Sequence, residues 1–143
     1  MSATSGSDPV LEGRCLCGAC GWTYRGRPDH ATSCNCGACR RFGALWAYGW
    51  IGAEIALTGA GRPYVRPIED SGLAFHHCPT CGCLTHWVAL APHEDGRTRA
   101  AVNLRMAVEP SAVRDVPVRL FDGADTWTAP EGLPPRSVGD YWL

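Results

Sequence analysis

Nine cysteines constrain this chain more than any other feature of its sequence. They form three groups of three, which are Cys15, Cys17 and Cys20; Cys34, Cys36 and Cys39; and Cys78, Cys81 and Cys83. An odd number of thiols cannot all pair as disulfides, and such dense groups are typical of metal sites. The alternative is a set of buried free thiols, since free cysteine is a frequent core residue. The density of the groups favours metal.

The rest of the composition favours one small, mainly β domain. The chain has 143 residues, of which 45% are hydrophobic, and this suits a single domain with its own core. The 17 glycines and 11 prolines interrupt the chain too often for long helices, so we expect short strands joined by turns. The most apolar stretch, residues 44–57, is too short to span a bilayer, and no membrane segment is expected.

Charge excludes some classes of partner. All 13 basic residues are arginine, so mechanisms that need a lysine amine are excluded. The net charge of -1 provides no basic face for a phosphate backbone, and no nucleic acid partner is expected. Residues 1–10 lack the charged and apolar regions of a secretory signal, so we expect a cytoplasmic protein.

Hydrophobic alternation and turn residues predict short elements along the chain. The expected strands are residues 21–25, 45–51, 55–58, 64–68, 73–77, 84–90 and 100–106. The only helical turns expected are at residues 39–42 and 110–114.

Cysteine spacing indicates how the thiols converge on an ion. Cys15 and Cys34 begin the same string, C-x-C-G-A-C, and in an extended chain its first two cysteines point to one face. The run C-P-T-C-G from Cys78 resembles a zinc knuckle, which supplies two of the four ligands that a closed site needs. A second pair must come from upstream. Iron in an iron–sulfur cluster is the rival metal, but the spacing matches no ferredoxin run, which favours zinc.

Four strings, found in this order, resemble the glutathione-dependent formaldehyde-activating enzyme family, which includes centromere protein V and has an Mss4-like fold. They are GRCLCGACGWTYRGRP from Gly13, CNCGACRRFGA from Cys34, FHHCPTCGCLT from Phe75 and VPVRLFDGADTW from Val116. The resemblance implies a zinc-binding domain of short antiparallel sheets over residues 11–127, with few helical turns. We expect residues 1–10 to be a disordered N-terminus and residues 128–143 to be a tail packed on the domain.

The resemblance also implies two zinc ions per chain. It assigns a structural zinc to Cys15, Cys17, Cys78 and Cys81, and a second, catalytic zinc to Cys34, Cys36 and Cys39. The chain departs from the family pattern at Cys20, His77 and Cys83, and at residues 103–105. We interpret Cys20 and Cys83 as core thiols, and His76 and His77 as surface or core histidines.

Three thiolates around a divalent ion leave one coordination position, which a thiol such as glutathione would fit. Arg40 and Arg41 directly follow Cys39, and we expect them to bind the carboxylates of such a substrate, the alternative being a solvated pair. The predicted function is that of a carbon–sulfur lyase acting on small thiol–aldehyde adducts such as S-hydroxymethylglutathione. The alternative is a zinc-stabilised binding module without catalysis.

Overall fold

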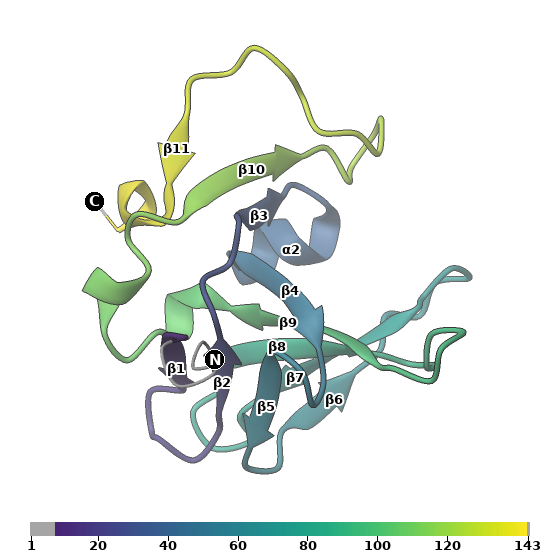
Figure 1. The fold of residues 1–143 in the computed structure, drawn as a ribbon. Coiled ribbons are helices and arrows are strands. Elements are labelled where there is room, and N and C mark those ends of the chain that lie inside the picture. Colours follow the sequence, from purple (N-terminus) through teal and green to yellow (C-terminus); the bar gives the residue numbers. More distant parts are fainter. Residues whose placement is uncertain (1–7, 143) are drawn as a thin grey trace.

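The computed structural model describes residues 8–142, which form two β-sheets and a few short helical segments (Figure 1). The strands are β1 (Val10–Arg14), β2 (Gly21–Arg25), β3 (Ala31–Cys34), β4 (Trp46–Trp50), β5 (Ile55–Thr58), β6 (Arg62–Tyr64), β7 (Leu73–His77), β8 (Leu84–Ala89), β9 (Arg99–Asn103), β10 (Pro117–Phe121) and β11 (Arg136–Ser137). The helical segments are α2 (Gly37–Phe42), η1 (Leu104–Met106), η2 (Pro110–Ala112) and η3 (Val138–Tyr141). The mainly β prediction is confirmed.

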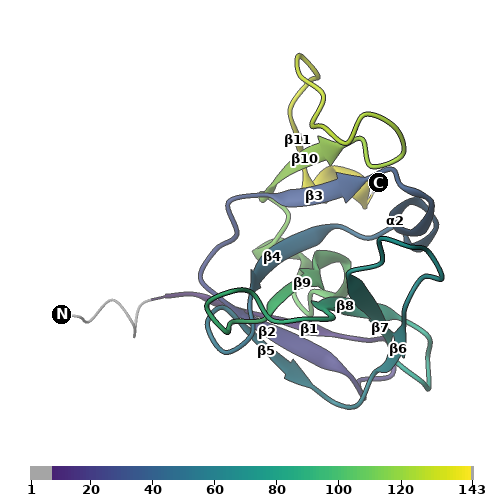
Figure 2. The ribbon, with the colours of Figure 1, turned by 90° about the vertical axis from the view of Figure 1, so that its right-hand side faces the viewer.

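The two sheets differ in size. The small sheet has the order β1-β2-β5, and the large sheet has the order β11-β10-β3-β4-β9-β8-β7-β6. Figure 2 shows the small sheet at one end of the molecule and β10 with β11 at the other. Among the strand pairs of the described residues, only β3 and β10 run parallel, so the large sheet is mixed rather than purely antiparallel.

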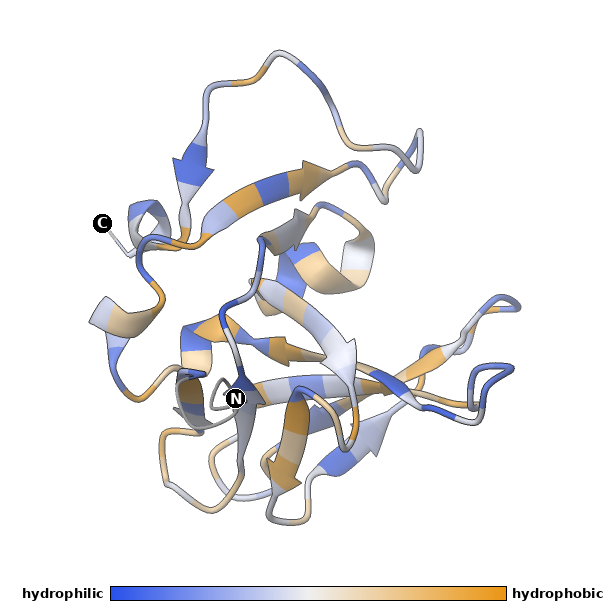
Figure 3. Ribbon diagram, in the orientation of Figure 1, coloured by the Kyte–Doolittle hydropathy of each residue, from blue (hydrophilic) through white to orange (hydrophobic). Residues whose placement is uncertain are grey.

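The main core lies between the small sheet and one face of the large sheet. Trp22 of β2 and Ile55 of β5 pack there against Ala47 and Val102, which are paired across β4 and β9. Successive residues of a strand point to opposite faces, so the neighbours of Ala47 point away from this core. Figure 3 shows the same alternation of apolar and polar residues along β10. The other face of the large sheet is thus left free to form a site.

Gly13 allows β1 and β2 to pair closely. It lies opposite Trp22, and a Cβ atom added to it would fall 2.1 Å from the Trp22 ring. Only glycine leaves room for this indole, which is 1% exposed and is among the largest buried side chains. The glycine therefore fixes how the small sheet meets the core.

Most of the predicted strands are confirmed, and two need correction. The strand expected at residues 64–68 ends at Tyr64, because β6 is an edge strand that pairs with β7 only over residues 62–64. Its Pro63 is tolerated at an edge. The strand expected at residues 100–106 ends at Asn103, whose side chain accepts a hydrogen bond from the Arg105 N–H (3.1 Å) and starts η1. The strands β1, β3, β10 and β11 were not predicted.

The two ends of the chain are described unequally. Of residues 1–10, for which we predict disorder, residues 1–7 lie outside the described part and Val10 begins β1. In the C-terminal tail, β11 pairs with β10, and Val138 is fully buried in the main core. No helix within residues 8–142 has the length and apolar character needed to cross a membrane.

Candidate metal centres

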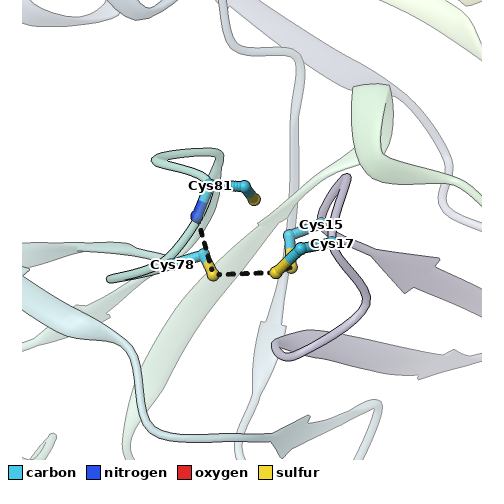
Figure 4. A group of neighbouring side chains, drawn as sticks. All are labelled: Cys15, Cys17, Cys78 and Cys81. Carbon is cyan, nitrogen blue, oxygen red and sulfur yellow. Dashed lines mark hydrogen bonds between the residues drawn. The ribbon is translucent and has the colours of Figure 1, made fainter.

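Two loops that are far apart in the sequence bring four cysteines together. Cys15 and Cys17 follow β1, and Cys78 and Cys81 lie between β7 and β8. Their sulfur atoms all lie within 4.8 Å of one another, and Figure 4 shows the side chains of one loop facing those of the other. The four thiols assigned to one zinc site thus converge at one point.

The sulfur spacing fits a tetrahedral metal site. The Cys17 Sγ atom lies 3.7 Å from Cys15 Sγ and 3.6 Å from Cys78 Sγ. Four sulfur atoms at zinc–thiolate bond length from a central ion would be about 3.8 Å apart. All of these cysteines are free thiols. The donor set and its spacing therefore suit zinc.

Cys15 and Cys17 reach the site from a turn, which corrects the prediction of an extended Cys-x-Cys segment here. The Gly18 N–H donates to the Cys15 carbonyl oxygen (3.0 Å) and closes the turn, and the Cys15 N–H donates to the Cys20 carbonyl oxygen (2.9 Å). The chain thereby doubles back from β1 into β2. Pairing between these two strands, rather than strand alternation, places the two thiols.

Backbone N–H groups stabilise the thiolate forms of the knuckle cysteines. The N–H groups of Cys83 and Cys17 lower the pKa of Cys81 to about 5. The N–H groups of Cys81 and Thr80 donate to Cys78 Sγ at 3.5 and 3.4 Å and lower the pKa of that thiol. Because cysteine binds metals as thiolate, these contacts favour metal binding.

Cys20 and Cys83 pack beside this site without joining the four converging sulfur atoms. Cys20 is buried, and burial raises the pKa of its thiol to about 11. The Cys83 carbonyl oxygen accepts a hydrogen bond from the Cys78 N–H (2.9 Å), as the Cys20 carbonyl does from Cys15. Both residues therefore contribute backbone contacts and packing to the two loops.

The middle three cysteines meet where β3 leads into α2. Cys34 is the last residue of β3, Cys36 is the N-cap of α2, and Cys39 lies within that helix. Their sulfur atoms lie within 4.8 Å of one another. Among the described residues, no fourth cysteine, histidine or carboxylate joins this group. The arrangement is that of a three-ligand site with one open position.

Hydrogen bonds orient these sulfur atoms. The Cys39 N–H donates to Cys36 Sγ (3.3 Å), and the Trp46 Nε1–H donates to Cys39 Sγ (3.3 Å). Burial raises the pKa of Cys34 and of Cys39. Burial also acts on Cys36, but hydrogen bonds led by the Cys39 N–H outweigh it and lower the Cys36 pKa. Cys36 is thus the thiol of this group that ionises most readily.

A cavity of about 1180 Å³ lies beside the three-cysteine site. Its floor is the free face of the large sheet, because alternate residues of three neighbouring strands line it. These residues are Thr32 and Cys34 of β3, Trp46 and Tyr48 of β4, and Arg119 and Phe121 of β10. Its walls are the segment from Arg66 to Leu73 and the loop from Gly123 to Trp127.

The arginines that line this cavity differ from the predicted ones. Arg40 and Arg41 are exposed on α2, and neither lines the cavity. The Arg41 guanidinium donates to the Gly37 carbonyl oxygen of its own helix (3.0 Å). Arg66 and Arg119 line the cavity instead. Arg119 faces the cavity because β10 pairs with β3 in a register that places it beside Thr32. No sequence signal indicates Arg66, which the loop after β6 brings near Gly37.

The two histidines before the knuckle lie outside the cavity. The His76 ring stacks on His86 with centroids 4.6 Å apart, and the His77 ring packs against Phe42 at 5.2 Å. Both make packing contacts, as the sequence interpretation expects.

The fold and its cysteines define a mainly β protein with a closed four-thiol centre and an open three-thiol centre beside a cavity. A family model described as glutathione-dependent formaldehyde-activating enzyme matches residues 10–115, and the chain belongs to this family. A Rhodobacter sphaeroides protein, solved by structural genomics, is 26% identical, with a TM-score of 0.53 over 75% of this chain and 98% of its own. No curated protein matches the chain.

Proposed function

We propose that this protein is a zinc-dependent carbon–sulfur lyase that acts on adducts of a small thiol and an aldehyde, of the S-hydroxymethylglutathione type. The observation that carries the proposal is the three-thiol centre, which opens to a cavity and lacks a fourth protein ligand in the described residues. Family membership supports the same class of reaction.

The two cysteine groups hold one zinc ion each in this proposal. Cys15, Cys17, Cys78 and Cys81 form the closed site, and Cys34, Cys36 and Cys39 form the open one. A zinc ion in the open site would favour the thiolate form of a substrate thiol, which makes a protein nucleophile unnecessary.

The cavity residues bind and orient the substrate. Arg66 and Arg119 supply guanidinium groups that pair with the carboxylates of a thiol such as glutathione. Arg41 contacts the cavity residue Gly37 near Arg66 and adds positive charge at the rim, and Arg40 is exposed on the same helix. Burial raises the pKa of Tyr48, so its hydroxyl stays protonated and is a hydrogen-bond donor for the substrate oxygen.

Thiol-dependent consumption of formaldehyde tests this proposal. The wild type should accelerate the loss of formaldehyde in the presence of glutathione, and Cys36→Ser should abolish the acceleration. Cys83→Ser is the matched control, because Cys83 lies outside both groups of converging sulfur atoms, and it should retain activity. A wild type that shows no thiol-dependent consumption would contradict the proposal.

A cobalt-substituted protein gives a second test, which needs no turnover. Glutathione should strengthen the sulfur-to-metal charge-transfer band of the wild type but not that of Cys36→Ser. If glutathione leaves the wild-type spectrum unchanged, the open position is not offered to a thiol, and a zinc-stabilised binding module becomes the better description. The proposal also places the protein in the cytoplasm, where its nine free cysteines would stay reduced.

A further inference from the structure

The cavity beside the three-cysteine site is much larger and more aromatic than a one-carbon aldehyde requires. Its volume of about 1180 Å³ exceeds the range of roughly 300–1,000 Å³ that is typical of pockets for drug-sized ligands. Besides one histidine, the cavity is lined by six aromatic side chains, which are Trp46, Tyr48, Phe75, Trp87, Phe121 and Trp127. The charged and amide groups of a thiol such as glutathione do not account for an aromatic lining either.

The register of the large sheet builds the aromatic floor. Tyr48 of β4 and Trp87 of β8 both pair with Ala101 of the intervening strand β9, so all three side chains lie on one face. Because Ala101 is small, the rings of Tyr48 and Trp87 meet across it with centroids 6.0 Å apart. Trp46 is buried, at 1% exposed, and packs against this floor with its ring centroid 6.5 Å from that of Trp87. Tyr48 and Trp87 therefore form a continuous aromatic surface over the small side chain of Ala101.

One sulfur atom of the centre contacts the tryptophan that packs against this floor. Cys39 Sγ accepts the hydrogen bond from Trp46 Nε1 (3.3 Å). Across the sheet, β3 with Cys34 lies between the aromatic strand β4 and the strand β10, which carries Arg119. A substrate centred on the three sulfur atoms would thus extend toward Arg119 on one side and toward Tyr48 and Trp87 on the other.

The mouth of the cavity adds a sixth aromatic ring in an uncommon backbone conformation. Trp127 is the only described non-glycine residue with a positive φ (59°), and its side chain is 70% exposed. Its N–H donates to the Asp122 carbonyl oxygen (2.8 Å), and its ring packs edge-on against Phe121 at 5.0 Å. Both aromatic residues lie beyond the region matched by the family model, which ends at residue 115.

We propose that the aldehyde this site prefers is aromatic, with formaldehyde as the poorer substrate. This inference rests on the proposed function and deepens it. In the reaction, the sulfur of the thiolate forms a bond to the carbonyl carbon of the aldehyde and the carbon–oxygen π bond breaks. Its electron pair takes up the proton that the thiol released on ionisation, which gives the hydroxyl of a hemithioacetal. No electron donor or acceptor is needed. The aryl group of the adduct packs on the half-buried rings of Tyr48 and Trp87, in the cavity whose mouth carries Trp127.

Binding of two glutathione thioethers tests the inference without turnover. S-benzylglutathione and S-methylglutathione share all charged groups and differ only in the aryl ring. We expect the benzyl compound to bind the wild type about tenfold more tightly in calorimetry, because burial of a phenyl group is worth at least that factor. Equal affinities, or no binding of the benzyl compound, would overturn the inference.

Three variants locate the preference. Trp87→Ala should remove most of the benzyl preference and leave the methyl compound unaffected. Trp127→Ala should weaken it as well, and since this side chain is exposed the variant should fold. Trp50→Ala is the matched control, because Trp50 stacks on Arg97 at 3.9 Å outside the cavity, and it should retain the preference. If Trp87→Ala and Trp127→Ala both retain it, the aryl group binds elsewhere and the inference is wrong.

Aldehyde consumption separates this inference from the proposed function. With glutathione present, benzaldehyde should be converted with a higher kcat/KM than formaldehyde. Conversion of formaldehyde alone, without a benzyl preference in binding, would overturn the aromatic specificity and leave the lyase proposal intact. Failure to convert either aldehyde would contradict the lyase proposal itself.

Discussion

The four-cysteine and three-cysteine centres begin with the same string, C-x-C-G-A-C, yet they form different kinds of site. After Cys15 the chain turns back into β2, and the knuckle at Cys78 closes over it. After Cys34 the chain enters α2, with Cys36 as the N-cap, and no second cysteine pair approaches within the described residues. The shared motif therefore does not determine which kind of metal site its cysteines form. The segment of the chain that packs against the motif determines it.

Their surroundings differ in the same way. Cys15 and Cys78 are 3% and 2% exposed and lie in a small cluster made of cysteines alone. The thiols of the middle group are all half-buried and line the cavity. In the four-cysteine centre, Cys17 is exposed and Cys81 is half-buried. We expect a closed four-thiol centre to stabilise the fold and an open centre at a cavity to bind a ligand. We therefore expect stability and activity to depend on different cysteines.

The largest effect should follow from opening the closed centre. Cys78→Ser should unfold or aggregate the protein, because structural zinc contributes on the order of 10 kcal/mol or more to the folding of small zinc modules. Circular dichroism and solubility after purification measure the effect. A soluble variant with a native spectrum would show that this centre is not structural.

A smaller effect should come from His86, whose titration makes the stability of the fold depend on pH independently of metal loss. Burial lowers the pKa of His86 from its ordinary value of 6.5 to about 4. The stabilisation it gives is therefore present above about pH 6.5 and is lost as the pH falls toward 4, since only the unfolded chain gains a proton in that window. Between about pH 7 and pH 5 the loss should reach about 2 kcal/mol.

The variant His86→Asn lacks this titration. The difference in unfolding free energy between the wild type and this variant should therefore shrink by about 2 kcal/mol from about pH 7 to pH 5. Protonation of metal ligands affects both proteins and cancels in the comparison. Urea unfolding at several pH values provides the free energies. A difference that stays constant with pH would mean that His86 does not titrate as its burial implies.

The smallest effect should appear at the open centre alone. A Cβ atom on Gly123 would lie 2.6 Å from Cys34 Sγ and 3.2 Å from Cys36 Cβ. Gly123→Ala should therefore displace Cys34 and weaken the second metal about tenfold, as loss of supporting contacts around metal ligands typically does. The thermal midpoint should hardly change.

Competition with a chelator measures this affinity. Gly72→Ala is the matched control, since Gly72 also lines the cavity but has no atom within 4 Å of an added Cβ. Equal metal retention by the two variants would mean that the loop at Gly123 does not support the centre.

The sequence predicted the local features of this molecule well. Strands such as residues 55–58 and 73–77 match because alternation and flanking glycines are local signals. The helical turn at residues 39–42 was expected and is the end of α2. The cysteine groups follow from spacing together with the family resemblance. In each case the relevant information lies within a few residues.

Features that depend on distant pairing could not be predicted in this way. The strand β3 is short and pairs in parallel with β10, more than eighty residues later, and this pairing places Arg119 beside Thr32. Ala101 lets the rings of Tyr48 and Trp87 meet, but this role follows only from the register of β4, β9 and β8. Arg40 and Arg41 adjoin a cysteine in sequence, yet the helix directs them to solvent. Long-range register therefore defines the cavity.

The zinc content and thermal midpoint of Cys36→Ser, compared with those of the wild type, test the central distinction most directly. The two centres predict two zinc ions per wild-type chain and one per variant chain, with nearly equal midpoints. Glutathione-dependent consumption of formaldehyde, or of benzaldehyde, should be lost in the same variant. A wild type with one zinc ion or mostly iron would contradict this account, and so would a Cys36→Ser variant that unfolds as Cys78→Ser is expected to do.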